Sequence, residues 1–137
     1  MTVKLIKLSK GKTIKNKKGN IIKFINKRDK LFKKFGELYF SEIKLKKEKG
    51  WNYHKKNTCL INVPFGKVRF RIYNVSKNKI QTILLSDKNN LILQIPPKNW
   101  FSFKSLTKKS LVANILDNVH QDKETDKKSK IKNFIIK

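Results

Sequence analysis

The chain has 137 residues, one cysteine, five glycines and three prolines, and its formal net charge is +26. A chain of this length can bury one hydrophobic core, so we expect a single domain over residues 1–137, with residues 119–137 as a C-terminal loop or tail. One cysteine excludes an internal disulfide and a cysteine-based zinc cluster. Apolar runs stay far below the roughly 18 residues of a membrane-spanning helix, and the first ten residues lack the pattern of a secretory signal, so we expect a cytoplasmic protein.

The positive charge is carried by lysine and is spread along the whole chain. The chain has 35 basic and 9 acidic residues, and the basic ones are lysines except for Arg28, Arg69 and Arg71. Lysine, asparagine and isoleucine are favoured by A/T-rich codons, so we interpret much of the lysine as background on a solvated surface. Proteins that recognise bases or phosphates more often use arginine, which binds them bidentately. A basic nucleic-acid-binding β domain therefore stays open, but as a lesser alternative.

Short alternating segments separated by turn residues predict strands along most of the chain. The turn signals recur about every 8 to 12 residues, which is typical of a sandwich or barrel. We therefore predict an all-β fold. The predicted strands lie near residues 3–8, 21–25, 38–45, 50–56, 58–63, 67–73, 79–85, 91–95, 100–106 and 110–116.

One segment breaks the alternation and predicts a short helix over residues 29–36. Leu31, Phe32 and Phe35 have the spacing of a helix face. Asp29 is a typical helix-capping residue at its start, and a glycine follows at its end.

Residues 49–56, with the sequence KGWNYHKK, form the most unusual segment. In a strand, Asn52 and His54 face one side, whereas Trp51 and Tyr53 face the other. An amide and an imidazole that face a core are costly unless they line a pocket. We therefore favour a pocket at this strand over the alternative of a solvent-facing edge.

Residues 67–73 have the cleanest alternation, and two of the three arginines lie on its polar face. Arg69, Arg71 and Tyr73 share this face, and codon bias does not account for arginine. Its planar guanidinium suits an anion such as a diphosphate. The alternative is a solvated face on which the arginine stems cover apolar surface.

An aromatic segment follows the Pro-Pro turn of residues 96 and 97. Trp100, Phe101 and Phe103 can stack on a sugar or a base, although core packing is the more common use of such residues. Outside these segments, we expect Cys59 to be a buried small hydrophobic residue and His120 to lie on the surface.

Four motifs, in this order, resemble the cupin-like sugar-nucleotide epimerases and isomerases. They are Gly-Trp-x-x-His-Lys-Lys at 50–56, Val-Pro-x-Gly-Lys-Val at 63–68, Pro-Pro-x-x-Trp-Phe-x-Phe at 96–103, and Asn-Ile followed by His at 114–120. The match covers about residues 17–122 and is similar to the group called dTDP-4-dehydrorhamnose 3,5-epimerase-like or WxcM-like. The resemblance implies a cupin-type β jelly roll (double-stranded β-helix), a homodimer, and a nucleotide-linked 4-keto-6-deoxy sugar in the barrel mouth.

The resemblance also implies proton transfer next to a keto group. Asn52 stands where the 3,5-epimerase motif has its basic histidine, and His54 stands where it has glutamine. The dTDP-4-keto-6-deoxyglucose 3,4-ketoisomerases carry Gly-x-His-x-His-Lys, of which this chain keeps the second histidine as His54 and the lysine as Lys55. The implied catalytic residues are His54 with Tyr53 or Tyr39, and the implied substrate-binding residues are Asn52, Lys55, Arg69, Arg71, Tyr73 and Trp100.

We therefore expect an epimerase- or isomerase-like protein that acts on or binds a nucleotide sugar in surface polysaccharide biosynthesis. The usual 3,5-epimerase catalytic residues are not matched, so a catalytically inactive cupin binding module stays open beside the enzyme. We expect no cofactor, no metal and no membrane contact.

Overall fold

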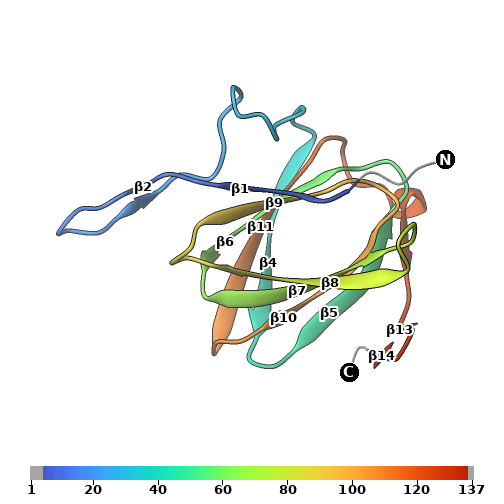
Figure 1. Ribbon diagram of the computed structural model, residues 1–137. Helices are drawn as coiled ribbons and strands as arrows, with labels where there is room; N and C mark the ends of the chain where they lie inside the picture. Colours follow the sequence, from blue (N-terminus) through green and yellow to red (C-terminus); the bar gives the residue numbers. More distant parts are fainter. Residues whose placement is uncertain (1–4, 136–137) are drawn as a thin grey trace.

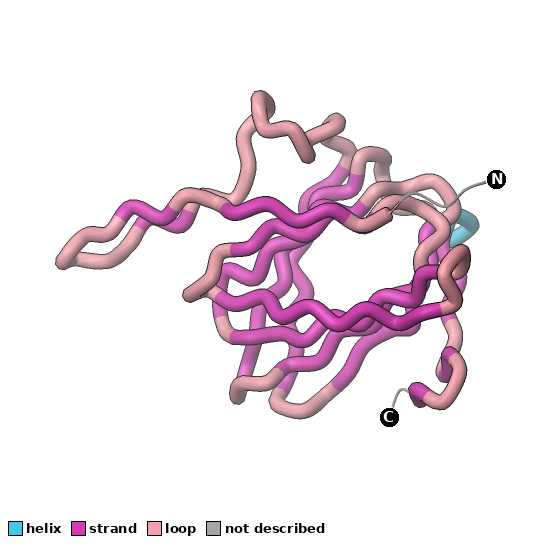
Figure 2. Tube along the Cα trace, in the orientation of Figure 1, coloured by secondary structure: helices cyan, strands magenta, loops and turns pink. Residues whose placement is uncertain are grey.

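The computed structural model describes residues 5–135, and its regular structure is almost entirely antiparallel β-strand (Figures 1 and 2). Two five-stranded sheets enclose the core, so the predicted all-β jelly roll is confirmed. The first sheet has the order β1 (Lys7–Lys10), β9 (Leu91–Ile95), β6 (Cys59–Phe65), β11 (Lys109–Leu116) and β4 (Glu37–Lys44). The second sheet has the order β12 (Thr125–Lys127), β5 (Glu48–His54), β10 (Trp100–Ser105), β7 (Lys67–Asn74) and β8 (Lys79–Ser86).

Two small hairpins and one helical turn complete the described chain. β2 (Thr13–Ile14) and β3 (Ile21–Ile22) form an arm that projects away from the barrel (Figure 1). The 3-10 turn η1 (Asp122–Glu124) precedes β12, and β13 (Lys130–Ile131) pairs with β14 (Phe134–Ile135). Over residues 5–135, no helix has the length and apolar character needed to cross a membrane.

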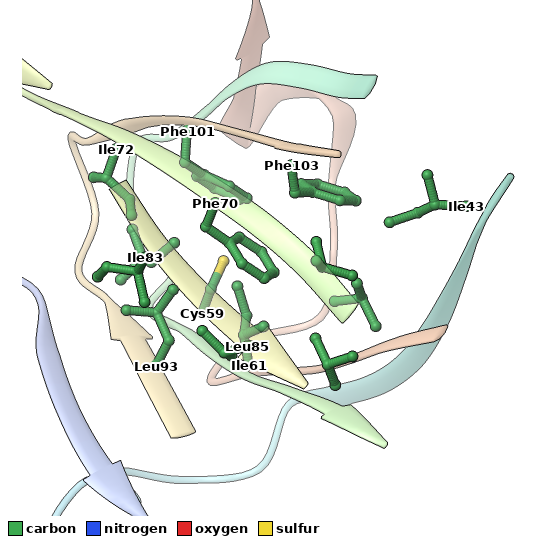
Figure 3. Packing of buried hydrophobic residues seen from close by; sticks show 14 of the residues in the cluster. Ile43, Cys59, Ile61, Phe70, Ile72, Ile83, Leu85, Leu93, Phe101 and Phe103 are labelled. Carbon is green, nitrogen blue, oxygen red and sulfur yellow. The ribbon is translucent and has the colours of Figure 1, made fainter. Parts of the chain in front are cut away.

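The hydrophobic core lies between the two sheets and follows from the alternation along the strands. Val68, Phe70 and Ile72 of β7 are fully buried in it. Figure 3 shows Phe70 close to Phe101 and Phe103 of β10, and the ring centroids of Phe70 and Phe103 lie 5.5 Å apart. Because side chains alternate across a strand, the odd-numbered residues of β7 lie on the outer face of the second sheet.

The strands predicted between residues 38 and 116 are all present, and their ends differ from the prediction by at most two residues. The first predicted strand, residues 3–8, is observed shifted along the chain as β1 (Lys7–Lys10), and its Val3 lies outside the described residues. The second, residues 21–25, is observed only as the short β3 (Ile21–Ile22). The tail is different from the prediction, because residues 122–135 contain η1, β12, β13 and β14. β12 has a polar sequence without an apolar pattern, and it becomes a strand by pairing with β5.

The predicted helix over residues 29–36 is wrong, since this segment forms turns. Asp29 accepts a hydrogen bond from the backbone N–H of Asn26, and its own carbonyl accepts one from Phe32. Such local side-chain bonds compete with a helix. Leu31 packs on the outer face of the first sheet, whereas Phe35 is 64% exposed. The apolar residues therefore cover the sheet without forming one helix face.

Gly50 lies at a register shift that sets the direction of the following side chains. β5 and β10 pair in one register at Phe101 and Asn52 and in another at Phe103 and Lys49. Gly50 has a φ of +114°, and a Cβ there would lie 2.7 Å from the carbonyl oxygen of Phe101 and 2.9 Å from Cα of Ser102. This bulge needs a glycine, both for its conformation and for its space.

We expect Gly50→Ala to lower the free energy of unfolding by roughly 1–3 kcal/mol, because it combines an unfavourable φ with a backbone clash. Gly19→Ala is the matched control, since Gly19 has a φ of +133° and no atom within 4 Å of the position that a Cβ would take. Chemical denaturation measures both variants. Equal losses in the two would contradict the close approach at Gly50.

Candidate functional site

A cavity opens between the edge strand β4 of the first sheet and the β5–β12 edge of the second. It consists of two adjoining hollows of about 440 Å³ and 350 Å³, both lined by Tyr39, Asn52 and Lys127. The larger hollow reaches inward to the rings of the core. The smaller one is also lined by His54. The cavity therefore connects the barrel interior with the surface and carries polar side chains along its length.

A larger groove of about 820 Å³ lies elsewhere, between β1 and residues 23–31. Its lining consists of lysines, apolar residues and small polar residues, with Asp29 as its acidic member and no histidine. The groups that can exchange a proton near neutral pH therefore gather in the cavity beside β5.

His54 is held in the cavity by a carboxylate from the C-terminal segment. Its Nδ1 lies 2.6 Å from Oε1 of Glu124, and the two side chains are 7% and 9% exposed. A carboxylate accepts the Nδ1–H of a neutral imidazole, which fixes the tautomer whose Nε2 carries the lone pair. Nε2 is then the ring nitrogen that carries the lone pair, on a side chain that lines the smaller hollow.

Glu124 also organises the loop after β5. It accepts hydrogen bonds from the backbone N–H groups of Lys56 (2.9 Å) and Asn57 (3.1 Å) and from Nδ2 of Asn57 (2.9 Å). Burial raises the pKa of Glu124, but the hydrogen bonds from Lys56, the His54 ring and Asn57 outweigh burial and hold the pKa below its ordinary value of 4.5. Glu124 is therefore an anion at neutral pH.

Tyr39 faces the same cavity from β4. Its hydroxyl accepts a hydrogen bond of 2.9 Å from Nδ2 of Asn114, and the Asn114 Oδ1 is buried without a hydrogen-bond partner. Burial, followed by the nearby Cys59, raises the pKa of Tyr39 to about 12. Tyr39 therefore keeps its proton at neutral pH, and because the hydroxyl oxygen accepts from Asn114, the proton is available to a ligand.

Cations and a second histidine complete the lining of the cavity. Lys49 and Lys127 line the larger hollow, and Nζ of Lys49 donates to Oγ of Ser41 over 2.9 Å. His120 is exposed, as we expected, and it also lies in the wall of the smaller hollow, with Nε2 3.3 Å from Oδ1 of Asp122. The larger hollow has two lysines and no acid among the described residues that line it and therefore prefers anions, whereas the smaller hollow also contains Glu37 and Asp122.

The structure thus brings together three of the sequence-predicted site residues, His54, Tyr39 and Asn52. It places the others outside the cavity. Lys55 lies in the loop after β5, where Nζ donates to the carbonyl of Lys123. The remaining five lie on the outer face of the second sheet: Tyr53, Arg69, Arg71, Tyr73 and Trp100.

Arg69 and Arg71 are engaged by an acid on that outer face. Nη2 of Arg69 lies 3.0 Å from Glu48, and Nη2 of Arg71 lies 2.7 Å from it. Because they alternate with the core residues of β7, they cannot point into the cavity from these positions. The predicted diphosphate contact at this pair would therefore lie on the outer face and not in the cavity, whereas Lys49 and Lys127 are the lysines that line the larger hollow.

Sequence reasoning missed Glu124, Lys127 and Asn114. Glu124 is 70 positions away from His54 in sequence, and no local pattern connects the two. Asn114 is a buried amide among buried apolar residues of β11. This single amide was the one sign in the sequence that a polar group lies at the inner end of the cavity. Residues 5–135 contain no group of three or more histidine, cysteine, aspartate or glutamate side chains placed to hold a metal ion.

Comparisons with known proteins give the same architecture. No protein-family model matches the chain, and no curated protein matches it. Among solved structures, a dTDP sugar isomerase from Desulfovibrio desulfuricans is 28% identical with a TM-score of 0.87, and the match covers 92% of this chain and 85% of that chain. The resemblance to the sugar-nucleotide epimerases and isomerases is confirmed.

Two further structures extend this likeness at the level of the fold. A dTDP-4-dehydrorhamnose 3,5-epimerase from Sulfolobus tokodaii is 22% identical, with a TM-score of 0.81 over 90% of this chain and 77% of that chain. The sugar 3,4-ketoisomerase QdtA from Thermoanaerobacterium thermosaccharolyticum, in complex with TDP, is 20% identical, with a TM-score of 0.76 over 88% of this chain and 86% of that chain. Both branches of the family therefore share this jelly roll.

We expect Glu124→Ala to lower the free energy of unfolding by roughly 1–3 kcal/mol at neutral pH, because it leaves several buried donors without an acceptor. The folded-state pKa of Glu124 is lowered, so its contribution is present above pH 4.5 and is lost as the pH falls through the folded-state pKa. Denaturation at several pH values should show the difference from wild type shrinking below pH 4.5.

Asp126→Ala is the control for this experiment. Asp126 belongs to the same segment, but its side chain is 50% exposed and lies 3.6 Å from Lys55. We expect a change within about 0.5 kcal/mol. A Glu124→Ala variant as stable as Asp126→Ala at neutral pH would contradict the role of Glu124 as a buried acceptor.

Proposed function

We propose that the chain binds a nucleotide-linked 4-keto-6-deoxy sugar in the cavity and transfers a proton at the carbon next to the keto group. The observation that carries the proposal is the pair of His54 and Glu124, buried at the wall of an open cavity whose larger hollow is lined by Lys49 and Lys127. A histidine fixed by a carboxylate is a general base near neutral pH. The expectations of a cytoplasmic homodimer and of surface polysaccharide biosynthesis stay predictions within this proposal.

His54 is the base in this reaction. Nε2 takes the proton from the sugar carbon, and the electron pair of the broken C–H bond moves to the keto oxygen to form an enolate. The imidazolium that results is stabilised by the anionic Glu124 at Nδ1, 2.6 Å away. This arrangement lowers the barrier because the compensating charge is in place before the proton moves.

Tyr39 is the acid. Its hydroxyl keeps its proton at neutral pH, because burial raises its pKa to about 12. A neutral hydroxyl donates a hydrogen bond to the developing enolate oxygen or returns a proton to the sugar. Return of the proton to the same carbon from the opposite face gives an epimer. Ketoisomerisation instead delivers a proton to the former keto carbon, while the keto oxygen is protonated and the hydroxyl on the first carbon loses its proton to become the new keto group.

Lys49 and Lys127 are the groups that we assign to the anionic part of the ligand. They line the larger hollow beside Asn52, both from the β5–β12 edge of the second sheet. The similar structures support an anionic ligand of this class, since QdtA was solved with TDP and a His-to-Asn variant of QdtA was solved with TDP-4-keto-6-deoxyglucose. A diphosphate and two ammonium groups form charge-assisted hydrogen bonds.

The decisive experiment is incubation with dTDP-4-keto-6-deoxyglucose in deuterated buffer, followed by NMR. Deuterium at carbons 3 and 5 identifies an epimerase, whereas deuterium at carbon 4 with the carbonyl moved to carbon 3 identifies a ketoisomerase. We expect His54→Gln to lose exchange by at least about a hundredfold, the usual contribution of a general base. Tyr39→Phe should lose the return of the proton to the sugar, and with it the formation of product.

The outcomes separate the alternatives. Ligand binding without any deuterium incorporation would favour the inactive binding module, which the sequence already suggested through Asn52 in the place of a histidine. Exchange by His54→Gln at the wild-type rate would remove His54 from the mechanism. Absence of any nucleotide-sugar binding would contradict the proposal as a whole.

We expect Lys49→Ala combined with Lys127→Ala to weaken dTDP binding by about tenfold or more, because a charge-assisted hydrogen bond contributes about 1.5–3 kcal/mol. The control removes two exposed lysines outside the cavity, Lys79 and Lys88. Isothermal titration calorimetry at fixed salt compares the two double variants. Equal losses would mean that the overall charge, and not the cavity, attracts the nucleotide.

A further inference from the structure

The C-terminal strap, defined here as residues 121–135, reaches both faces of the second sheet. At its start, η1 places Glu124 against His54 on the cavity side. β12 then runs along the edge of β5, and the β13–β14 hairpin lies beside the outer face of the same sheet (Figures 1 and 2). One short segment therefore connects the cavity with the opposite face.

The backbone of the strap pairs with the second half of β5, from Trp51 to His54, and with Lys55 after it. The N–H of Lys55 donates to the carbonyl of Glu124 over 2.8 Å. Further along, Trp51 and Lys128 exchange two backbone hydrogen bonds of 2.9 and 3.0 Å. Thr125 pairs directly with His54 in the register of β12 and β5. Movement of the strap would therefore move Glu124 relative to His54.

The far end of the strap is fixed by an outer anchor that consists of Trp51, Arg71 and Phe134. The guanidinium carbon of Arg71 lies 5.5 Å from the ring centre of Trp51 and 4.8 Å from that of Phe134. Nε1 of Trp51 donates to the carbonyl of Phe134 over 3.1 Å. Trp51 faces away from the core, yet it is fully buried because the strap covers it.

The anchor explains why this lysine-rich chain uses arginine here. Arg71 donates to both carboxylate oxygens of Glu48 at 2.7 Å, and its guanidinium carbon lies over the rings of both Trp51 and Phe134. Only a planar, delocalised cation can satisfy both contacts, and an ammonium group is a poor substitute.

We propose that Arg71 and Phe134 are positioning residues for His54, which hold the strap on the outer face so that Glu124 stays bound to the imidazole on the cavity face. η1 has three residues and no side-chain cap, and β12 has three residues, so neither holds the strap by itself. Terminal segments with few contacts of their own open locally unless they are tied down. The catalytic meaning of this coupling rests on the proposed function, but the coupling itself does not.

The test uses the full chain with ¹⁵N-labelled histidine, without any substrate. The chain has two histidines, and His120→Gln assigns their signals. We expect the His54 Nδ1–H resonance, visible in wild type, to broaden or disappear in Phe134→Ala. Amide hydrogen exchange of residues 124–127 should become about 5- to 30-fold faster, the factor that corresponds to the loss of a cation–π contact and its neighbours.

Ile135→Ala is the matched control, because Ile135 is the next residue of the same hairpin and is 53% exposed. It should leave the resonance and the exchange rates unchanged. Arg71→Lys keeps the charge but removes the planar group, and we expect it to behave like Phe134→Ala. A global unfolding measurement on each variant separates local opening from loss of the fold.

An unchanged His54 resonance in both Phe134→Ala and Arg71→Lys, with exchange rates within twofold of Ile135→Ala, would overturn the inference. The proposed function fails in a different way. If these NMR effects occur but the wild-type protein exchanges no deuterium into the keto sugar, the coupling stands and the enzymatic proposal does not. If the wild type is active and both variants keep its kcat and pH profile, the strap does not position His54.

Discussion

The hydrogen bond of 2.6 Å between His54 and Glu124 is the contact on which the rest of the site depends. It joins β5 to the C-terminal strap. The same Glu124 carboxylate also orders the loop after β5 by accepting the backbone N–H groups of Lys56 and Asn57. It also directs the second ring nitrogen toward the cavity. Without this carboxylate, His54 would be one imidazole in a polar cavity, with neither a fixed tautomer nor a compensating charge.

Strand alternation separates two roles within the second sheet. The inward residues of β5, Asn52 and His54, line the cavity, whereas the outward Trp51 belongs to the anchor under the strap. The same rule places Phe70 in the core and Arg71 on the outer face. The second sheet therefore carries cavity-lining residues on one side and the anchor residues under the strap on the other.

The sequence predicted the fold well, because period-2 alternation is a local signal and the core requires it. It also predicted that Asn52 and His54 share a face. It could not predict which face of a strand borders the cavity, because alternation assigns residues to two faces without showing what each face contacts. Arg71 was assigned to a ligand for that reason. Glu124 was missed because its contact with His54 depends on the tertiary structure alone, and its segment has no apolar pattern.

Of the positive groups behind the net charge of +26, the two that we assign to the nucleotide are Lys49 and Lys127 in the cavity. Titration of the ¹⁵N-labelled protein with dTDP, observed at the histidine side chains and at the arginine Nε–H groups, tests the central claim most directly. We predict saturable shifts of His54 and small, unsaturable changes at Arg69 and Arg71. Saturable shifts of the two arginines with an unchanged His54 would place the nucleotide on the outer face and contradict the site described above.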